Sequence, residues 1–360
     1  MLKLNSISVF QFKNYKNRSF DFDCRITGIC GKNGVGKTNL LDAIYYLCFT
    51  KSYFSSTDVI NVLQGASGFR LEGNFELNNK NETAECILRE TGKKEFLLNK
   101  AVYQKFSQHI GHYPCVAIAP DDSRLITGGS EQRRSFLDAL LSQIDPVYLT
   151  YLIRYNKILQ QRNSFLKAAA EANRVDEALL QVLDEQLLLA GNFIFSKRRD
   201  FLVSFLPKVK RLYTDIAQQV ENLSIVYDSP LLYHRFEDLL KVARLKDQIQ
   251  QRTTQGIHRD DLTIQLGEQA FKSIASQGQR KSLLFALKLT ELEVIKTEKG
   301  FAPILLLDDV FEKLDEERIC SLLKTVCIEN EGQVFITDTN SVRLAHHLNG
   351  IGVPHQMILL

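Results

Sequence analysis

The run Gly31-Lys32-Asn33-Gly34-Val35-Gly36-Lys37-Thr38 decides the fold that we expect for this chain. The mostly apolar run 25–30 precedes it and is typical of a short buried strand. The apolar residues that follow lie at the spacing of one face of an amphipathic helix: Leu40, Ile44, Leu47 and Cys48. Strand, glycine loop and helix in this order are the context in which GxxxxGK[ST] binds phosphate, so a plain glycine turn is the weaker alternative.

This loop predicts a site for a nucleoside triphosphate, ATP, with Mg²⁺. Its backbone N–H groups and the helix N-terminus converge on phosphate oxygens. Lys37 can reach the β- and γ-phosphates and support catalysis, and the Thr38 hydroxyl can bind the metal ion. The nucleotide-binding residues expected here are Gly31, Lys32, Asn33, Gly34, Val35, Gly36, Lys37, Thr38 and Asn39.

Composition limits the class of protein without identifying it. The 360 residues are 44% hydrophobic and 24% charged, which is ordinary for a soluble globular chain. A net charge of +3 neither indicates nor excludes a nucleic-acid partner. The seven cysteines form no C-x-x-C pair and several lie in apolar runs, which favours a reducing compartment. We find no 18-residue apolar stretch and no signal-peptide pattern, so we expect a cytoplasmic protein without a membrane partner.

Periodicity divides the chain into three parts. Alternating apolar residues predict strands over 1–30 and antiparallel hairpins over 69–98. Helical spacing dominates 131–249, where three apolar repeats predict helices packed side by side. Strand patterns return after residue 255. We therefore expect an α/β fold: a P-loop nucleotide-binding head with a mixed sheet, built from 1–130 and 250–360, and an all-helical lobe inserted at 131–249.

Two carboxylates end a predicted buried strand at Ile304-Leu305-Leu306-Leu307-Asp308-Asp309. Beside a phosphate loop, Asp308 can hold Mg²⁺ through its waters. Asp309 projects differently and can polarise the attacking water as the catalytic general base. The alternative is an acidic turn after a core strand, which the phosphate loop makes less favourable.

Ser276-Gln277-Gly278-Gln279-Arg280 begins a predicted long helix. Ser276 suits an N-cap, and the same residue types at a helix N-terminus also make an anion site. The run lies 32 residues before Asp308 (308 − 276) and resembles the signature motif of ABC-type ATPases. The resemblance implies that Ser276, Gly278 and Gln279 contact the nucleotide of an opposite subunit. Leu314-Asp315 similarly resembles the D-loop, which adds Asp315 to the nucleotide-binding residues.

The chain as a whole resembles the RecF family of DNA replication and repair proteins. The runs that carry the likeness are Arg133-Arg134-Ser135-Phe136-Leu137-Asp138, Gly256-Ile257-His258-Arg259-Asp260-Asp261-Leu262, Leu307-Asp308-Asp309-Val310-Phe311-Glu312-Lys313-Leu314-Asp315 and Gln333-Val334-Phe335-Ile336-Thr337. The resemblance implies an SMC-like head that forms a homodimer on ATP and binds double-stranded and gapped DNA. It further implies slow, DNA-stimulated hydrolysis that times release, and action with RecO and RecR in RecA loading and SOS induction.

Two other machines share these motifs. An ABC transporter subunit would lack a helical insertion of about 120 residues. A longer-armed SMC or nuclease-linked head would need more residues than this chain has. Basic clusters on predicted helices are either a solvated face or DNA phosphate contacts: Lys197, Arg198, Arg199, Lys208, Lys210 and Arg211. His258 beside Arg259 is either catalytic or part of a hydrogen-bonded turn, which is the commoner case. The γ-phosphate sensor near Thr337-Asp338-Thr339, the Q-loop near Pro120-Asp121-Asp122 and the RecR surface stay unassigned.

Overall fold

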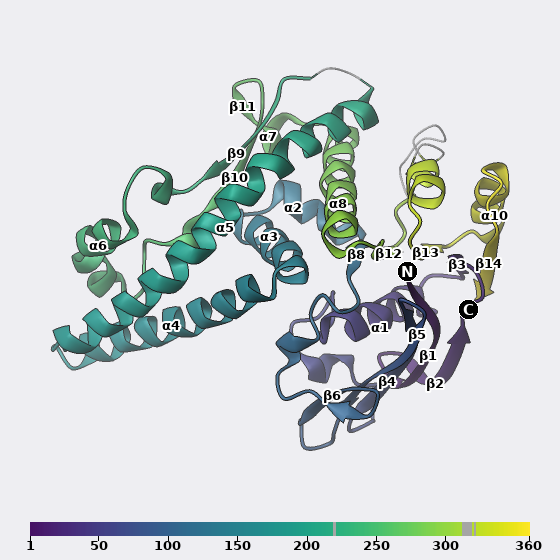
Figure 1. Ribbon diagram of the computed structural model, residues 1–360, viewed down its shortest axis with the longest axis horizontal. Coiled ribbons are helices and arrows are strands. Elements are labelled where there is room, and N and C mark those ends of the chain that lie inside the picture. The colour runs from purple at the N-terminus through teal and green to yellow at the C-terminus, as the bar shows by residue number, and fades with distance from the viewer. Residues whose placement is uncertain (219–220, 312–318, 320–321) are drawn as a thin grey trace. The chain divides into compact units, whose positions relative to one another are not determined.

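Five parallel strands form a sheet in the order β14-β3-β13-β12-β8 (Figure 1). Their bounds are β3 Ile26–Cys30, β8 Cys115–Ile118, β12 Ile304–Leu307, β13 Val334–Asp338 and β14 His355–Leu359. Every residue of β3, β8, β12 and β13 is buried, as continuous apolar strands of a covered parallel sheet require. The predicted buried strands are confirmed. The register pairs Asp338 with Cys30 and Leu307 with Ile118, so their carboxyl ends meet at one edge.

An antiparallel sheet, ordered β2-β1-β4-β5-β6-β7, comes from the predicted hairpins. Its strands are β1 Leu2–Phe12, β2 Tyr15–Asp21, β4 Phe69–Leu77, β5 Lys80–Leu88, β6 Lys94–Leu98 and β7 Ala101–Val102. In β4 the residues Phe69, Leu71 and Phe75 are buried while Arg70 and Asn74 are exposed, which is the alternation of a half-buried sheet. The first hairpin turns at 13–14, slightly before the expected 14–17.

Helix α1 (Lys37–Phe49) packs against strands of both sheets, including β4 and β13. The predicted helix is confirmed, but eleven of its 13 residues are buried, so the expectation that it is amphipathic is wrong. The physical reason is that two sheets cover it, and its polar residue Asp42 is compensated inside by Lys13 at 2.6 Å. Together with helix α10 (Ser341–Gly350), which packs on β3 and β14, these elements form the first of two units.

The structure describes residues 1–218, 221–311, 319 and 322–360. They separate into unit 1 (Met1–Asp122 and Lys288–Leu360) and unit 2 (Ser123–Leu287). These limits differ from the expected 130/131 and 249/250, because residues 250–287 pack within unit 2. Helix α8 (Gln277–Lys299) begins in unit 2 and ends in unit 1. Short helical turns in unit 1 are η1 Asp58–Asn61, η2 Phe106–Gln108, η3 Pro120–Asp122 and η6 Thr325–Glu329.

Unit 2 is built around the helical hairpin of α4 (Pro146–Glu171) and α5 (Glu177–Ala217), visible in Figure 1. The second and third apolar repeats, at 180–194 and 202–216, lie on one 41-residue helix, α5, which continues through Pro207. The remaining helices are α2 Ser123–Thr127, α3 Ser130–Ile144, α6 Phe236–Gln250 and α7 Phe271–Ile274, with the turns η4 Pro230–Leu232 and η5 Ile257–Arg259.

The inserted lobe is not all-helical, which corrects our expectation. Strand β9 (Leu223–Asp228) lies inside 131–249 and pairs antiparallel with β10 (Asp261–Leu266), and β11 (Gln269–Ala270) completes a three-stranded sheet. The pairing partner of β9 is distant in sequence, so helical periodicity around it concealed the strand.

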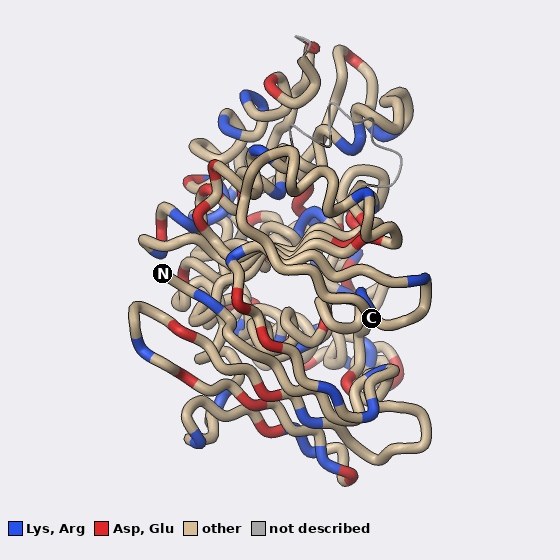
Figure 2. The backbone as a smooth tube through the Cα atoms, turned by 90° about the vertical axis from the view of Figure 1, so that its right-hand side faces the viewer, with Lys and Arg blue, Asp and Glu red and all other residues tan. Residues whose placement is uncertain are grey.

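In Figure 2, basic and acidic residues are interspersed along the backbone, in keeping with the small net charge.

One described helix, α5, is long and apolar enough to cross a membrane by length and composition alone. Its middle carries Arg198, which is 1% exposed and ion-paired inside unit 2, as a packed helix of a globular lobe allows. The six described cysteines are free thiols, and all but Cys24 are buried, as the sequence predicted.

Candidate nucleotide-binding site

The phosphate loop connects β3 to α1, as predicted. Gly34 and Gly36 have φ angles of 83° and 117°, in the left-handed region that glycine adopts without strain. A side chain at Gly36 would also lie within 3 Å of Asn14 and Tyr15. The glycines at these two positions are therefore needed for the curl of the loop.

Lys37 lies inside this curl and is 5% exposed. Its Nζ donates hydrogen bonds to the carbonyl oxygens of Gly31, at 3.0 Å, and Lys32, at 3.3 Å. The ammonium is thus held against the loop backbone, at the side of the α1 N-terminus. A phosphate chain cradled by the loop N–H groups would meet this charge.

Asp308 follows β12 and reaches the first turn of α1. Its two carboxylate oxygens accept from Thr38 Oγ1 at 3.0 and 2.9 Å, although 270 residues separate the two in sequence. Burial raises the pKa of Asp308, and the hydrogen bonds from Thr337 and Thr38 oppose that shift. A hydroxyl beside a carboxylate is the hard-oxygen donor set that suits Mg²⁺, so the residues present fit this ion.

Thr337, at the end of β13, holds Asp308 from the other side. Its Oγ1 donates to Asp308 Oδ1 at 2.8 Å and accepts from the Asp309 backbone N–H at 2.9 Å. The sequence placed Thr337 near the open sensor position without giving it this role. The signal was available in principle, since β13 lies between β3 and β12 and its carboxyl end must reach both motifs.

Asp309 has a φ angle of 44°, which is unusual for a residue with a side chain. This conformation turns the chain directly after Asp308, so the two carboxylates leave the strand end in different directions. Asp309 is partly exposed, whereas Asp308 is buried. Two adjacent carboxylates of different environment suit the separate metal-holding and base roles predicted for them.

The β1–β2 turn supports the phosphate loop in a way that the sequence analysis missed. Asn14 Nδ2 donates to the Val35 carbonyl at 2.9 Å, and the Tyr15 hydroxyl donates to the Gly36 carbonyl at 3.1 Å. Asn39 in turn donates to Asn14 Oδ1 at 2.7 Å. These hydrogen bonds anchor the phosphate loop to the β1–β2 hairpin.

Ser276 caps helix α8 in unit 2. Its Oγ accepts from the Gln279 N–H at 3.2 Å, and Gln279 Oε1 accepts from the Ser276 N–H at 2.7 Å, which is a reciprocal capping box. Ser276 is exposed, and Gly278 and Gln279 are partly exposed. The cap is thus observed, and the predicted contact with a second subunit's nucleotide stays a prediction. Asp315, Leu314 and the rest of the predicted D-loop lie outside the described residues.

The two arginine- and aspartate-rich runs, 133–138 and 256–262, pack together in unit 2. Arg133 forms a bidentate pair with Asp261 at 2.6 and 2.9 Å, and Arg134 donates to the Asp260 carbonyl. His258 Nδ1 bonds to the Tyr155 hydroxyl at 2.7 Å, and burial lowers the pKa of His258 to about 4. His258 is therefore a neutral, hydrogen-bonded residue of a turn entering β10, as the simpler interpretation held.

The predicted DNA contacts divide in the structure, and Arg198 is a correction. It is buried between Asp138 and Asp260, at 2.7 and 3.2 Å, because α5 turns this residue into the lobe. Lys197 pairs with Asp145, and Arg199 pairs with Asp200. Lys210 and Arg211 are exposed, and Lys208 is partly exposed. Contact with DNA stays a prediction for the other five residues.

Comparison with known proteins covers both units. A family model described as the RecF/RecN/SMC N terminal domain matches residues 3–357. The DNA replication and repair protein RecF of Flavobacterium johnsoniae is 42% identical over 342 residues, 95% of this chain and 95% of that protein. The solved structure of the recombination mediator protein RecF-ATP in the RecFOR pathway has a TM-score of 0.88 at 30% identity, covering 94% of this chain and 92% of the other. An Smc head domain of Pyrococcus furiosus, 17% identical with a TM-score of 0.55, covers 96% of this chain and 92% of that chain and shares the fold.

Proposed function

Because the chain belongs to the RecF family of DNA replication and repair proteins, we propose that it is an ATP-switched DNA-binding protein of recombinational repair. It binds ATP with Mg²⁺, forms a homodimer around the nucleotide and holds duplex or gapped DNA. Slow hydrolysis, stimulated by DNA, then times release. RecO, RecR and RecA are the partners that the family implies, and a cytoplasmic location agrees with the free buried cysteines.

One observation carries the nucleotide part of this proposal. Thr38 of the phosphate loop and Asp308 at the end of β12 meet at 2.9 to 3.0 Å, although they come from opposite ends of the chain. Nothing in local sequence requires that meeting. A loop that cradles phosphates and a carboxylate placed for a metal ion are the two halves of an ATPase site.

Each residue has a role that its position supports. Lys37 neutralises phosphate charge from inside the loop, and Thr38 and Asp308 hold the metal ion and its waters. The ion, when bound, neutralises charge that develops on the phosphate oxygens. Thr337 keeps Asp308 oriented, and Asp309 accepts a proton from the attacking water.

The decisive measurement is ATP turnover with and without duplex DNA. We expect DNA to raise turnover by the wild-type protein and to have no effect on Lys37→Ala. Asp309→Asn should bind ATP and dimerise yet hardly hydrolyse, and asparagine keeps the backbone comparable because it tolerates a positive φ. Wild-type turnover in Asp309→Asn would refute the base assignment, and indifference to DNA would favour another ABC/SMC-type machine.

A mixing experiment tests whether the nucleotide is shared between subunits. Ser276→Arg should bind ATP as a monomer but not dimerise, and Lys37→Met should fail at binding itself. In the mixed dimer one pocket carries both changes, whereas the other combines an intact Lys37 with an intact Ser276. Partial dimerisation and some hydrolysis should therefore return. A covalently tethered pair that stays inactive, or a fully active Ser276→Arg protein, would contradict the shared site.

A further inference from the structure

Three cations of unit 2 line a groove of about 500 Å³. They are Lys246 on α6, Arg252 in the following loop and Arg259 in η5. None of them forms an ion pair with a carboxylate that the structure describes, and all three are exposed. Neighbouring cations are paired: Arg235 and Lys241 with Glu237, and Arg244 with Glu177. We call this feature the Arg259 groove.

The rest of the lining is mostly polar, with Pro230 as its one apolar residue. It includes Asp228, Thr254 and Gln255, so that three positive charges face one negative charge. Thr and Gln side chains are frequent donors to phosphate and sugar oxygens. The lining residues include no aromatic side chain on which an unpaired base could stack. The groove therefore suits an anionic backbone better than an apolar ligand or a single-stranded base.

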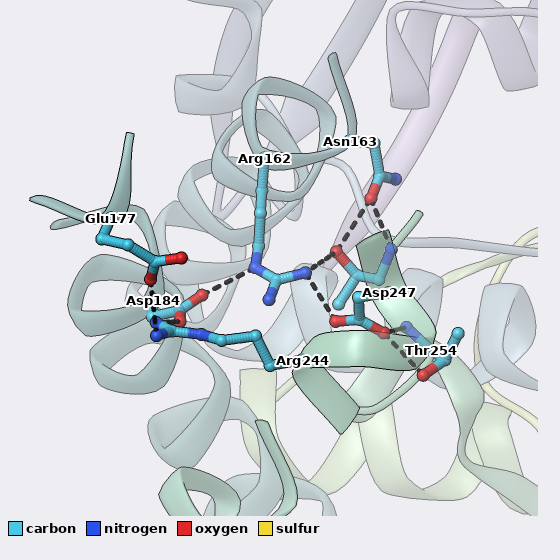
Figure 3. A network of polar contacts seen from close by, with 8 residues as sticks. Arg162, Asn163, Glu177, Asp184, Arg244, Asp247 and Thr254 are labelled. Carbon is cyan, nitrogen blue, oxygen red and sulfur yellow. Dashed lines mark hydrogen bonds and ion pairs between the residues drawn. The ribbon is translucent and has the colours of Figure 1, made fainter. Parts of the chain in front are cut away.

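A buried polar network fixes the loop that carries two of these cations (Figure 3). Arg162 is fully buried and donates to Asp247, at 2.7 Å, and to Thr253 Oγ1, at 2.9 Å. Asp247 accepts from the Thr254 backbone N–H and hydroxyl at 2.8 and 2.6 Å. Asn163 Oδ1 accepts from the Thr253 N–H at 2.7 Å. Helices α4 and α6 thus meet beneath residues 252–255 and hold them in place.

The same loop is held at its far end. His258 Nε2 donates to the Thr253 carbonyl at 3.1 Å, and Arg198 Nη1 donates to the Ile257 carbonyl at 2.9 Å. Gly256 has a φ of 129°, and a side chain there would lie 2.6 Å from the Tyr155 hydroxyl. The backbone under Arg252 and Arg259 is therefore fixed, which lowers the entropy lost when an anion binds.

We infer that the Arg259 groove contacts the phosphate backbone of duplex DNA. The inference rests on the proposed DNA-binding function and gives it a location. Guanidinium groups pair with phosphate oxygens through two parallel hydrogen bonds, and a lysine adds a point charge. Since the lining offers no base stacking, this contact is independent of sequence.

The test is the salt dependence of duplex binding by the full-length protein with ATP. The variant Lys246→Gln/Arg252→Gln/Arg259→Gln removes the three charges at exposed positions. A labelled duplex of random sequence serves as the probe, with binding measured over a range of KCl concentrations. We expect at least a tenfold loss of affinity, and a slope of log K against log [KCl] shallower by about 2 to 3, since each phosphate contact contributes about 0.9.

A matched variant separates location from net charge. Lys197→Gln/Lys210→Gln/Arg211→Gln removes the same charge from α5, at positions that the sequence analysis had named as candidate DNA contacts. It should change the slope less than the groove variant does. Equal changes in both variants, an unchanged slope in the groove variant, or a loss confined to single-stranded DNA would each overturn the inference. Failure of the wild-type protein to bind duplex would instead refute the proposed function. Arg259→Lys, which keeps charge but loses the guanidinium fork, should lie between wild type and Arg259→Gln.

Discussion

The buried arginine of the helical lobe offers a sharp test of how unit 2 is held together. Arg162 is 0% exposed and lies between Asp184 and Asp247, whose side chains are 13% and 0% exposed. Replacing Arg162 by methionine keeps much of its volume but leaves Asp247 as a buried carboxylate without a cation. Removing one partner of a buried ion pair costs about 3–5 kcal/mol. Asp247 retains two hydrogen bonds from Thr254, so we expect a loss near the lower end, about 3 kcal/mol.

The second step of this test removes the stranded charge. In Arg162→Met/Asp247→Asn the amide oxygen can still accept from Thr254, and no buried charge remains. We expect this double variant to be about 2 kcal/mol more stable than Arg162→Met alone, because the cost of an unpaired buried charge is removed. Arg235→Met breaks only an exposed pair and should cost under about 1 kcal/mol.

Urea unfolding followed by far-ultraviolet circular dichroism is the suitable assay, since the chain has no tryptophan and helices dominate unit 2. Hydrogen exchange at the Thr254 amide, which donates to Asp247, gives a local reading of the same network. A double variant no more stable than Arg162→Met would refute the reasoning, because the stranded charge would then not be the cause of the loss.

Three further predictions concern the nucleotide site and the pH dependence of stability. Lys37→Ala should weaken ATP binding at least tenfold, about 1.4 kcal/mol, in calorimetric titration; near-normal affinity in the folded variant would contradict the site. Because burial raises the pKa of Asp308, its ionisation destabilises the fold at neutral pH, so nucleotide-free Asp308→Asn should melt at a higher temperature than wild type at pH 7, with the difference vanishing toward acid pH. Because burial lowers the pKa of His258 to about 4, wild-type stability should decline as pH falls from about 6.5 toward 4, and His258→Gln should show a shallower decline in thermal melts.

The sequence predicted those parts of the site whose functional residues lie next to one another in the chain. The phosphate loop and the carboxylates after β12 are each a short run with strict residue requirements, and both lie where expected. Thr337 and Asn14 were missed for the opposite reason. Each acts through a partner far away in the chain, Thr337 on Asp308 and Asn14 on Val35, and only the strand order brings them there.

The helical part was predicted less well because periodicity does not show what covers a surface. Arg162 interrupts the apolar repeat of α4, yet it is fully buried, since Asp184 and Asp247 arrive from other helices to compensate it. For the same reason α1 was expected to have one buried and one exposed face, although strands of two sheets pack against it. Strand β9 was lost because its partner β10 follows more than 30 residues later.

The run Gly256–Asp261 shows how one polar motif combines two tasks. Asp260 and Asp261 turn inward to Arg198 and Arg133, and His258 binds Tyr155. Only Arg259 is turned out of η5 without such a partner among the described residues. In the sequence, the four consecutive titratable residues 258–261 suggest a single catalytic cluster. The tight 3₁₀ turn instead divides them, so that three residues stabilise the backbone which presents the fourth. Loss of any of the three should therefore weaken duplex binding through the position of Arg259, whereas Arg259→Gln should weaken it while leaving the melting temperature almost unchanged.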